Sequence, residues 1–259
     1  MVERTRIRSD IAWSTPDRIV VRGRELTTDI IGTVDLGGMA FLTLTGRLPD
    51  ADEARLFNAI AVTLVEHGIT PSVIAARMTY MGAPEAMQAA VGAGLAGLGS
   101  VFVGSIEGVA RYVQEGLAAK GEHTIAEVAA AIVSEHRAAK RPVPGIGHNQ
   151  HKGGDPRVPR LFQIARECGL AASEIALVEE VAAAAEKATG RSLPINATGA
   201  IGAIAAGLGI PWKAARGIGV MARAIGLVGH LLEEAGNPIA YEIWQRAEDE
   251  AGAHLRPKD

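Results

Sequence analysis

Cysteine is nearly missing from this chain, and so is any excess of one charge. The single cysteine among 259 residues, Cys168, excludes an intramolecular disulfide and a zinc cluster built from cysteines. Lys and Arg total 26 against 29 Asp and Glu, so no basic surface is expected for nucleic acid or an anionic membrane. Residues 1–13 carry charges without an apolar core and do not form a secretory signal. We therefore expect a soluble cytoplasmic protein.

Long hydrophobic runs are also rare. Two uncharged stretches, 89–106 and 195–212, are long enough to cross a membrane. They consist mainly of Gly and Ala, and the second contains Asn196, Thr198 and Pro211. Small residues let helices approach closely, so we expect buried helices here and no membrane partner. With 48% apolar and 21% charged residues, the chain can form one large domain or two modest ones.

Apolar residues recur with helical spacing through most of the chain. The repeat that starts at Asp50 predicts a helix with an Asp50–Glu53 capping box and a stop at Gly68. Strand signals are few, and the best candidate is a short hairpin over 18–26. The sequence therefore predicts an all-α fold. Further helices are expected over 155–169, 173–190 and 211–236.

The least helical long stretch, 141–154, lies between two of these helices and is rich in polar groups. His148 and His151 are three residues apart, which raises the possibility of a metal site. No further His or carboxylate stands close in sequence apart from Asp155, and Lys152 adds a positive charge, so we expect no metal.

Anion binding is a second interpretation of this loop. Gly145 and Gly147 allow close backbone approach, while Lys152 and Arg157 supply positive charge. The helix expected to start at Asp155 would add its N-terminal amides. Arg157 is unfavourable in a first helical turn unless it faces a carboxylate or a phosphate. A solvated basic loop is the alternative, and the residues alone leave both open.

The predicted helix over 211–236 carries a second group of candidates. Arg216, Arg223 and His230 are spaced by seven and share one stripe, among small and apolar neighbours. An arginine in such surroundings is either paired structurally or binds an acidic ligand; for Arg223 we favour the ligand, and for His230 a structural role. His67, expected in the last turn of the helix from Asp50, needs no catalytic role by itself.

Five segments taken together resemble the citrate synthase superfamily, and more particularly its short citryl-CoA lyase-like branch, which includes the C-terminal module of ATP-citrate lyase. The strongest is GIGHNQHKGGDPR, which is similar to the family's Gly-x-Gly-His-x-x-x-(Lys/Arg)-x-x-Asp-Pro-Arg. The resemblance runs from Gly23 to Trp244 and covers most of the chain. The other four segments are GRELTTDIIGTVDLGGMAFLTLTGRLP, VEHGITPSVIAAR, LPINATGAIGA and ARAIGLVGHLLEE.

The resemblance implies roles for the residues that match. His148 matches the family's catalytic His, which hydrogen-bonds the substrate hydroxyl or carbonyl oxygen. Arg157 and Arg223 match carboxylate-binding arginines, and His67 matches a substrate-binding His. Lys152 falls where the family places a basic residue toward the phosphates of coenzyme A. The further residues assigned by resemblance are Phe102 and Asn196 for the substrate, and Gly145, Gly147 and His151 for coenzyme A.

Two departures from the family pattern bear on catalysis. Thr198 stands where the family has its catalytic Asp, and a threonine hydroxyl is no comparable base near pH 7. In FVGSIEG, Phe102 replaces the His of the citrate synthase His-Gly-Gly-Ala, as it does in ATP-citrate lyase. In the catalytic site, Thr198 would then bind substrate or position a water, and the base would come from elsewhere, with His151 as the candidate. No counterpart of the carboxylate-binding Arg from the partner subunit is found, which suits a substrate with fewer carboxylates than citrate.

The resemblance implies an enzyme that cleaves a carbon–carbon bond of a 3-hydroxyacyl-CoA, or forms it in reverse. The family default is citryl-CoA giving acetyl-CoA and oxaloacetate. An acyl-CoA-binding regulatory protein without turnover is the alternative, and another reaction on the same scaffold is a third. The implied architecture is a homodimer whose small domain, 109–211, closes over a large domain formed by 1–108 and 212–259. Coenzyme A is the co-substrate, and no metal is expected.

Overall fold

The computed structural model describes residues 7–147 and 154–256, and its helices confirm the all-α fold class. The predicted site residues His148, His151 and Lys152 lie outside the described residues. In chain order the elements are β1 (Ala12–Ser14), β2 (Ile19–Val21), β3 (Arg24–Glu25), η1 (Leu26–Ile30), α1 (Leu36–Thr45), α2 (Ala51–Val65), α3 (Pro71–Gly82), α4 (Met87–Ala96), η2 (Gly99–Val103), α5 (Gly104–Ala118), α6 (Ile125–Ala138), α7 (Arg157–Glu167), α8 (Ala172–Thr189), α9 (Ala197–Gly207), α10 (Trp212–Gly236), α11 (Ala240–Gly252) and η3 (Ala253–Leu255).

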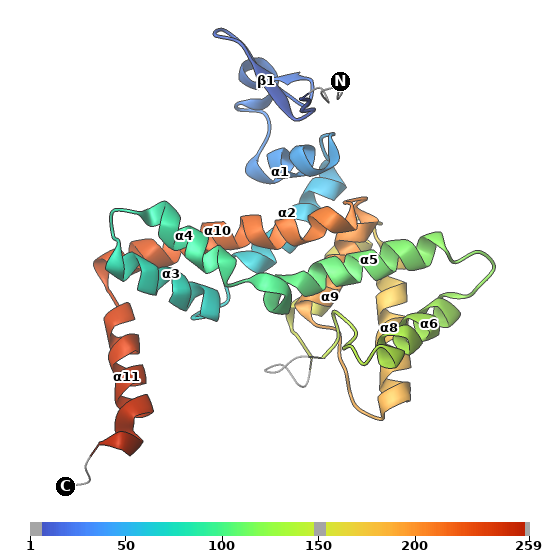
Figure 1. The fold of residues 1–259 in the computed structure, drawn as a ribbon. Coiled ribbons are helices and arrows are strands. Elements are labelled where there is room, and N and C mark those ends of the chain that lie inside the picture. The colour runs from blue at the N-terminus through green and yellow to red at the C-terminus, as the bar shows by residue number, and fades with distance from the viewer. Residues whose placement is uncertain (1–6, 148–153, 257–259) are drawn as a thin grey trace, which may run out of the picture.

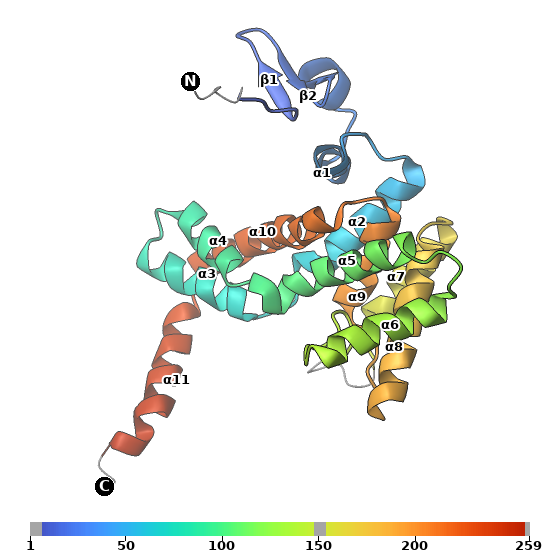
Figure 2. The same ribbon diagram turned by 45° about the vertical axis from the view of Figure 1, so that its right-hand side comes forward.

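The long helix α10 forms the axis of the molecule (Figure 1). It packs against α2, α3, α4 and α5, while α6 packs against α8 at one end. Two parts extend from this body in both views: the N-terminal sheet, which precedes α1 in the chain, and α11 at the C-terminal end (Figure 2). The helix α11 lies beyond the last helix that the sequence analysis predicted.

The expected hairpin is present as β2 and β3. Val20 pairs with Glu25 and Val21 with Arg24, and the turn between them places Arg22 and Gly23 at positive φ, 49° and 79°. Glycine adopts such a φ without steric cost, which explains its place in this turn. The strand β1, which no sequence signal predicted, adds antiparallel to β2 and completes a three-stranded sheet in the order β1-β2-β3.

The predicted boundaries of α2 and α7 need two corrections. The capping box at Asp50 is present, but α2 ends at Val65, so His67 lies beyond the helix and not in its last turn. Helix α7 begins at Arg157, with Pro156 as its N-cap, and not at Asp155 as predicted. The Asp155 side chain nevertheless accepts a hydrogen bond from the Arg157 backbone N–H at 3.1 Å, as an acidic residue at a helix start is expected to do.

The Gly- and Ala-rich stretch 195–212 forms a core helix, as predicted. Helix α9 is buried along nearly its whole length and packs against α5. Contact is close because Gly202 lacks a side chain: a Cβ there would lie 2.5 Å from the Cβ of Val109. The stretch 89–106 instead spans α4, η2 and the start of α5, with a bend of 66° at the break and Phe102 47% exposed.

By length and composition α10 could also cross a membrane, and so could the bent pair of α4 with η2 and α5. One face of α10 belongs to the main core, where Ala215, Ile218 and Ala222 are buried. The absence of a membrane partner therefore stays a prediction. The division into domains at 108 and 211 also stays a prediction, and the first of these positions falls inside α5.

Candidate active site

The two segments with the strongest sequence signals lie against each other. Ile146 forms an antiparallel bridge with Ile195, and Gly147 N donates to the Pro194 carbonyl at 2.7 Å. Gly145 must be a glycine here, because its φ is +81° and a Cβ would lie 2.7 Å from the Cα of Gly199. The structure therefore explains the glycine at 145 by close packing, and coenzyme A binding by Gly145 and Gly147 stays a prediction.

Asn196 organises the start of α9. Its Oδ1 accepts from Gly199 N at 3.1 Å and from the Thr198 hydroxyl at 2.6 Å, while its Nδ2 donates to the Gly147 carbonyl at 2.7 Å. The amide thus caps the helix and ties it to the residue that precedes His148 in the sequence. Asn196 and Thr198, both predicted site residues, are brought together with the 145–147 segment, and Asn196 has a structural role there.

A residue that the sequence analysis did not select joins this group. Ser105, near the start of α5, donates from its Oγ to the Thr198 Oγ1 at 2.9 Å. The two residues are 93 positions apart, so no local spacing could have paired them. One signal in the sequence could have drawn attention to Ser105: it stands at the Ala position of the citrate synthase His-Gly-Gly-Ala motif, in which Phe102 replaces the His. Phe102 itself has no contact here that assigns a role, and substrate binding by it stays a prediction.

Asp155 and Arg157 form a buried ion pair beside the same helix start. The Asp155 side chain is fully buried and accepts from Arg157 Nε at 2.9 Å, from Arg157 Nη2 at 2.7 Å and from Ala197 N at 3.1 Å. Burial opposes ionisation, but the guanidinium and the backbone N–H groups outweigh it and lower the pKa of Asp155 to about 2. Arg157 therefore faces a carboxylate, one of the two anions that its helical position requires.

Arg223 on α10 is a half-buried cation with an unused donor. Its Nη1 atom is buried and has no hydrogen-bond partner among the residues that the structure describes. Burial lowers its pKa, the nearby Glu66 carboxylate opposes that change, and the nearby Arg157 guanidinium adds to it. A buried, unpaired guanidinium N–H that feels the charge of a second arginine is suited to an anionic ligand.

Glu66 links Arg223 to the segment that carries His67. Its Oε1 accepts from the backbone N–H groups of His67 and Gly68 at 2.8 and 2.6 Å, and its Oε2 lies 2.9 Å from His230 Nε2. Burial opposes ionisation of Glu66, but the His230 and backbone contacts prevail and lower its pKa. The structure thus places His67 beside this carboxylate, although substrate binding by His67 stays a prediction.

The stripe on α10 therefore divides into different roles. Arg216 forms an ion pair with Glu107 at 2.8 Å. His230 Nδ1 is 2.8 Å from Nη2 of the fully buried Arg77, which can only donate, so His230 accepts at Nδ1. This agrees with the structural role favoured for His230. Arg216 and His230 each face a carboxylate, whereas the buried Nη1 of Arg223 has no partner in the described structure, so Arg223 keeps the ligand-binding interpretation.

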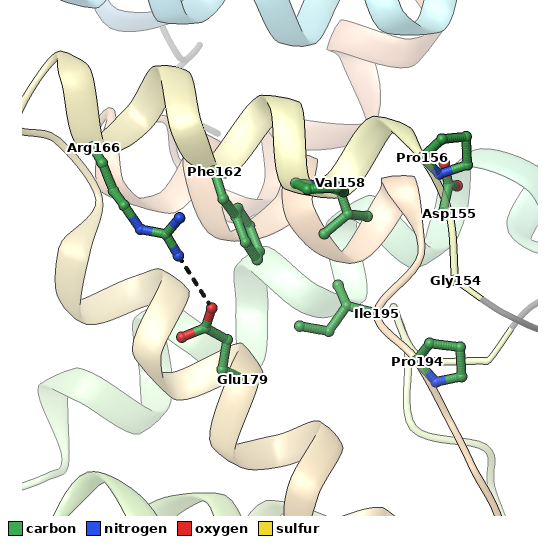
Figure 3. Close-up of a pocket in the computed structure, with 10 residues that line it drawn as sticks. Gly154, Asp155, Pro156, Val158, Phe162, Arg166, Glu179, Pro194 and Ile195 are labelled. Carbon is green, nitrogen blue, oxygen red and sulfur yellow. Dashed lines mark ion pairs between the residues drawn. The ribbon is translucent and has the colours of Figure 1, made fainter.

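Two cavities flank the N-terminus of α7. One, of about 550 Å³, is lined by Asp155, Pro194 and Ile195, and the Arg166–Glu179 ion pair closes its far side at 3.5 Å (Figure 3). The other, of about 600 Å³, lies between α2 and α7 and includes Arg157. In residues 7–147 and 154–256, no three His, Cys, Asp or Glu side chains gather around a common point for a metal. The absence of a metal stays a prediction.

Comparisons with known proteins show the family of this chain. The family described as citrate synthase, C-terminal domain, matches residues 27–244. The structure of citryl-CoA lyase from Hydrogenobacter thermophilus is 33% identical, with a TM-score of 0.80 over 88% of this chain and 86% of that one. A search of curated proteins found no match.

Two further solved structures share the fold. ATP citrate lyase from Methanothrix soehngenii, in complex with citrate and coenzyme A, is 21% identical with a TM-score of 0.71, covering 91% of this chain and 40% of that one. Citrate synthase from Pyrobaculum aerophilum is 25% identical with a TM-score of 0.58, over 78% of this chain and 50% of that one.

Proposed function

Because the chain belongs to the citrate synthase family, we propose that it is a carbon–carbon lyase that cleaves a 3-hydroxyacyl-CoA. Citryl-CoA, giving acetyl-CoA and the 2-oxo acid oxaloacetate, is the first substrate to test. The observation that carries the proposal is the buried, unpaired Nη1 of Arg223 beside Arg157, which suits the carboxylate of such a substrate. The similarity to a citryl-CoA lyase over most of both chains supports the same assignment.

In the proposed reaction, Arg223 and Arg157 hold a substrate carboxylate. As the carbon–carbon bond breaks, the hydroxyl that His148 hydrogen-bonds loses its proton and becomes the carbonyl of the 2-oxo acid, and the released acyl-CoA carbon takes up a proton to give acetyl-CoA. His67 contributes to substrate binding. Lys152 binds the phosphates of coenzyme A, with His151 and the backbone at Gly145 and Gly147 nearby.

The condensing direction is the same reaction read in reverse. We further propose a cytoplasmic homodimer whose segment 109–211 closes over the substrate, with no metal, membrane or nucleic acid involved.

A second candidate function is an acyl-CoA-binding protein without turnover, and one observation favours it. Thr198 stands at the place of the family's catalytic Asp, and its hydroxyl donates a hydrogen bond to Asn196 Oδ1 at 2.6 Å. The position therefore has no carboxylate, and the hydroxyl proton is already used in this hydrogen bond. If no other group replaces the lost base, the protein binds coenzyme A esters and releases no product.

The two functions are separated by offering the purified protein citryl-CoA and citramalyl-CoA and measuring both binding and acetyl-CoA release. A lyase releases acetyl-CoA, and His148→Ala abolishes this. Arg223→Leu should raise KM about 10- to 100-fold, since a charged hydrogen bond is lost. The control is Arg246→Leu, which removes an exposed arginine on α11 that pairs with Glu242, and it should leave KM unchanged. Binding without release of acetyl-CoA would favour the second function.

A further inference from the structure

The hydroxyl groups of Ser105 and Thr198 form a hydrogen-bonded pair between α5 and α9. The catalytic and binding roles proposed above do not explain this pair. Ser105 lies in the first turn of α5 and Thr198 in the first turn of α9, and their oxygens are 2.9 Å apart. Both side chains belong to residues that are partly exposed, so the pair borders solvent and is not sealed in the core.

The direction of the hydrogen bonds in this pair is fixed by Asn196. Its Nδ2 donates to the Gly147 carbonyl, so the other end of the amide must be the oxygen. That oxygen already accepts from Gly199 N, and it lies 2.6 Å from the Thr198 oxygen. Two acceptors cannot share a hydrogen bond without a proton, so Thr198 donates to Asn196. The Thr198 oxygen is then the acceptor for the Ser105 proton.

Both hydroxyl protons are therefore committed, and only oxygen lone pairs remain for a ligand. A hydroxyl has two acceptor lone pairs and one proton, so Ser105 keeps two and Thr198 keeps one. A neutral hydroxyl oxygen is too weak a base to remove a proton from an acyl-CoA carbon at pH 7. Such a pair can accept a hydrogen bond from an N–H or O–H of a ligand, and no titratable group is part of it.

The pair is connected to the residues assigned to the substrate. Ala197, between Asn196 and Thr198, donates its N–H to Asp155, which holds Arg157. Gly147, which accepts from Asn196, directly precedes His148 in the sequence. The start of α9 is thus tied to Arg157 through Asp155, and to the residue before His148 through Asn196.

We propose that Ser105 is a positioning residue for Thr198, and that the two hydroxyls form an acceptor site for an N–H or O–H of the bound coenzyme A ester. This inference rests on the proposed binding of such esters and adds a residue that the family resemblance does not assign. In this arrangement Thr198 takes the place of the family Asp in position but does not act as a base.

The test is a double-mutant cycle in the Kd for acetyl-CoA, measured by calorimetry without any need for turnover. Ser105→Ala and Thr198→Val should each weaken binding about five- to tenfold, the effect of one neutral hydrogen bond. The double variant should weaken it by clearly less than the product of the two, because the residues act as a unit. Thr198→Ser, which keeps the hydroxyl, should restore binding to within about twofold.

A second readout separates positioning from catalysis by a base. The methyl protons of saturating acetyl-CoA exchange with deuterated water only if a base removes them, and NMR follows this exchange. Thr198→Asp, which places the family carboxylate at this position, should raise the exchange rate above that of the unmodified protein, whereas Thr198→Val should not abolish the exchange that the unmodified protein shows. Thr189→Val is the matched control and should change neither Kd nor exchange, because the Thr189 hydroxyl makes only local contacts in the described structure: it donates to the Ala185 carbonyl and accepts from Arg191 N at the end of α8.

Three results would overturn the inference. Multiplicative effects of Ser105→Ala and Thr198→Val on Kd would show that the hydroxyls act separately. A loss of methyl exchange on Thr198→Val, at saturation, would show that Thr198 acts as the base. If the unmodified protein binds no acetyl-CoA at all, the proposed function fails first, and the acceptor site fails with it for lack of a ligand.

Discussion

The Asp155–Arg157 pair makes the stability of the protein depend on pH in a calculable way. The Asp155 carboxylate is fully buried, and its pKa falls from an ordinary 3.8 to about 2 in the folded protein. One pKa unit corresponds to about 1.4 kcal/mol, so the fall of the Asp155 pKa from 3.8 to about 2 contributes roughly 2–3 kcal/mol to the free energy of unfolding at pH 7. The folded-state pKa is depressed, so this contribution is complete above pH 4 to 5 and declines as pH falls toward 2.

Asp155→Asn is the corresponding change, because it keeps the shape and one acceptor oxygen but removes the charge. Urea unfolding should show a loss of roughly 2–3 kcal/mol at pH 7, and about half of that difference should remain at pH 3. Asp249→Asn is the matched control: its exposed pair with Arg256, at 2.9 Å, should contribute less than about 1 kcal/mol. A loss for Asp155→Asn that is the same at pH 7 and pH 3 would refute the assignment of a depressed pKa to this carboxyl.

Three further predictions concern stability and binding. Arg77→Met leaves the buried Glu234 carboxylate without its 2.8 Å partner and should lower the free energy of unfolding by about 3–5 kcal/mol in urea; a loss under 1 kcal/mol would contradict this. Gly145→Ala should cost about 3 kcal/mol by the same assay, from its φ and its packing, whereas Gly121→Ala, at φ +51° in open space, should cost about 1 kcal/mol. Arg157→Lys keeps the charge but loses the two-pronged contact with Asp155 that orients the side chain toward the substrate carboxylate. The KM for the acyl-CoA should therefore rise about tenfold in steady-state assays, and an unchanged KM would count against a substrate role.

The sequence was most informative where local chemistry decides the structure. The Asp50–Glu53 capping box, Gly23 in its turn and the Gly/Ala composition of 195–212 each predict an element that is present. Helix ends were less accurate, because Glu66 leaves the helix and uses its carboxylate on the next two backbone N–H groups. A side-chain contact of this kind has no periodic signal.

The candidate site was predictable in part, from motifs and, for Arg223, also from its spacing and its small neighbours on α10. The motifs selected Asn196, Thr198 and Arg223, and spacing alone could not tell that Arg223 keeps an unpaired N–H while Arg216 is paired. That difference depends on Glu107, which comes from another helix. Ser105 was missed for the same reason, since its partner is distant in the chain and close only in the fold.

The most direct test of the proposed function is the identity of the products formed from citryl-CoA. Chromatography of a single reaction mixture would resolve acetyl-CoA, free coenzyme A, oxaloacetate and citrate. Cleavage of the carbon–carbon bond predicts acetyl-CoA and oxaloacetate in equal amounts, with their formation lost in His148→Ala. Free coenzyme A and citrate in equal amounts would show thioester hydrolysis instead, and this result, like the absence of any product, would contradict a carbon–carbon lyase.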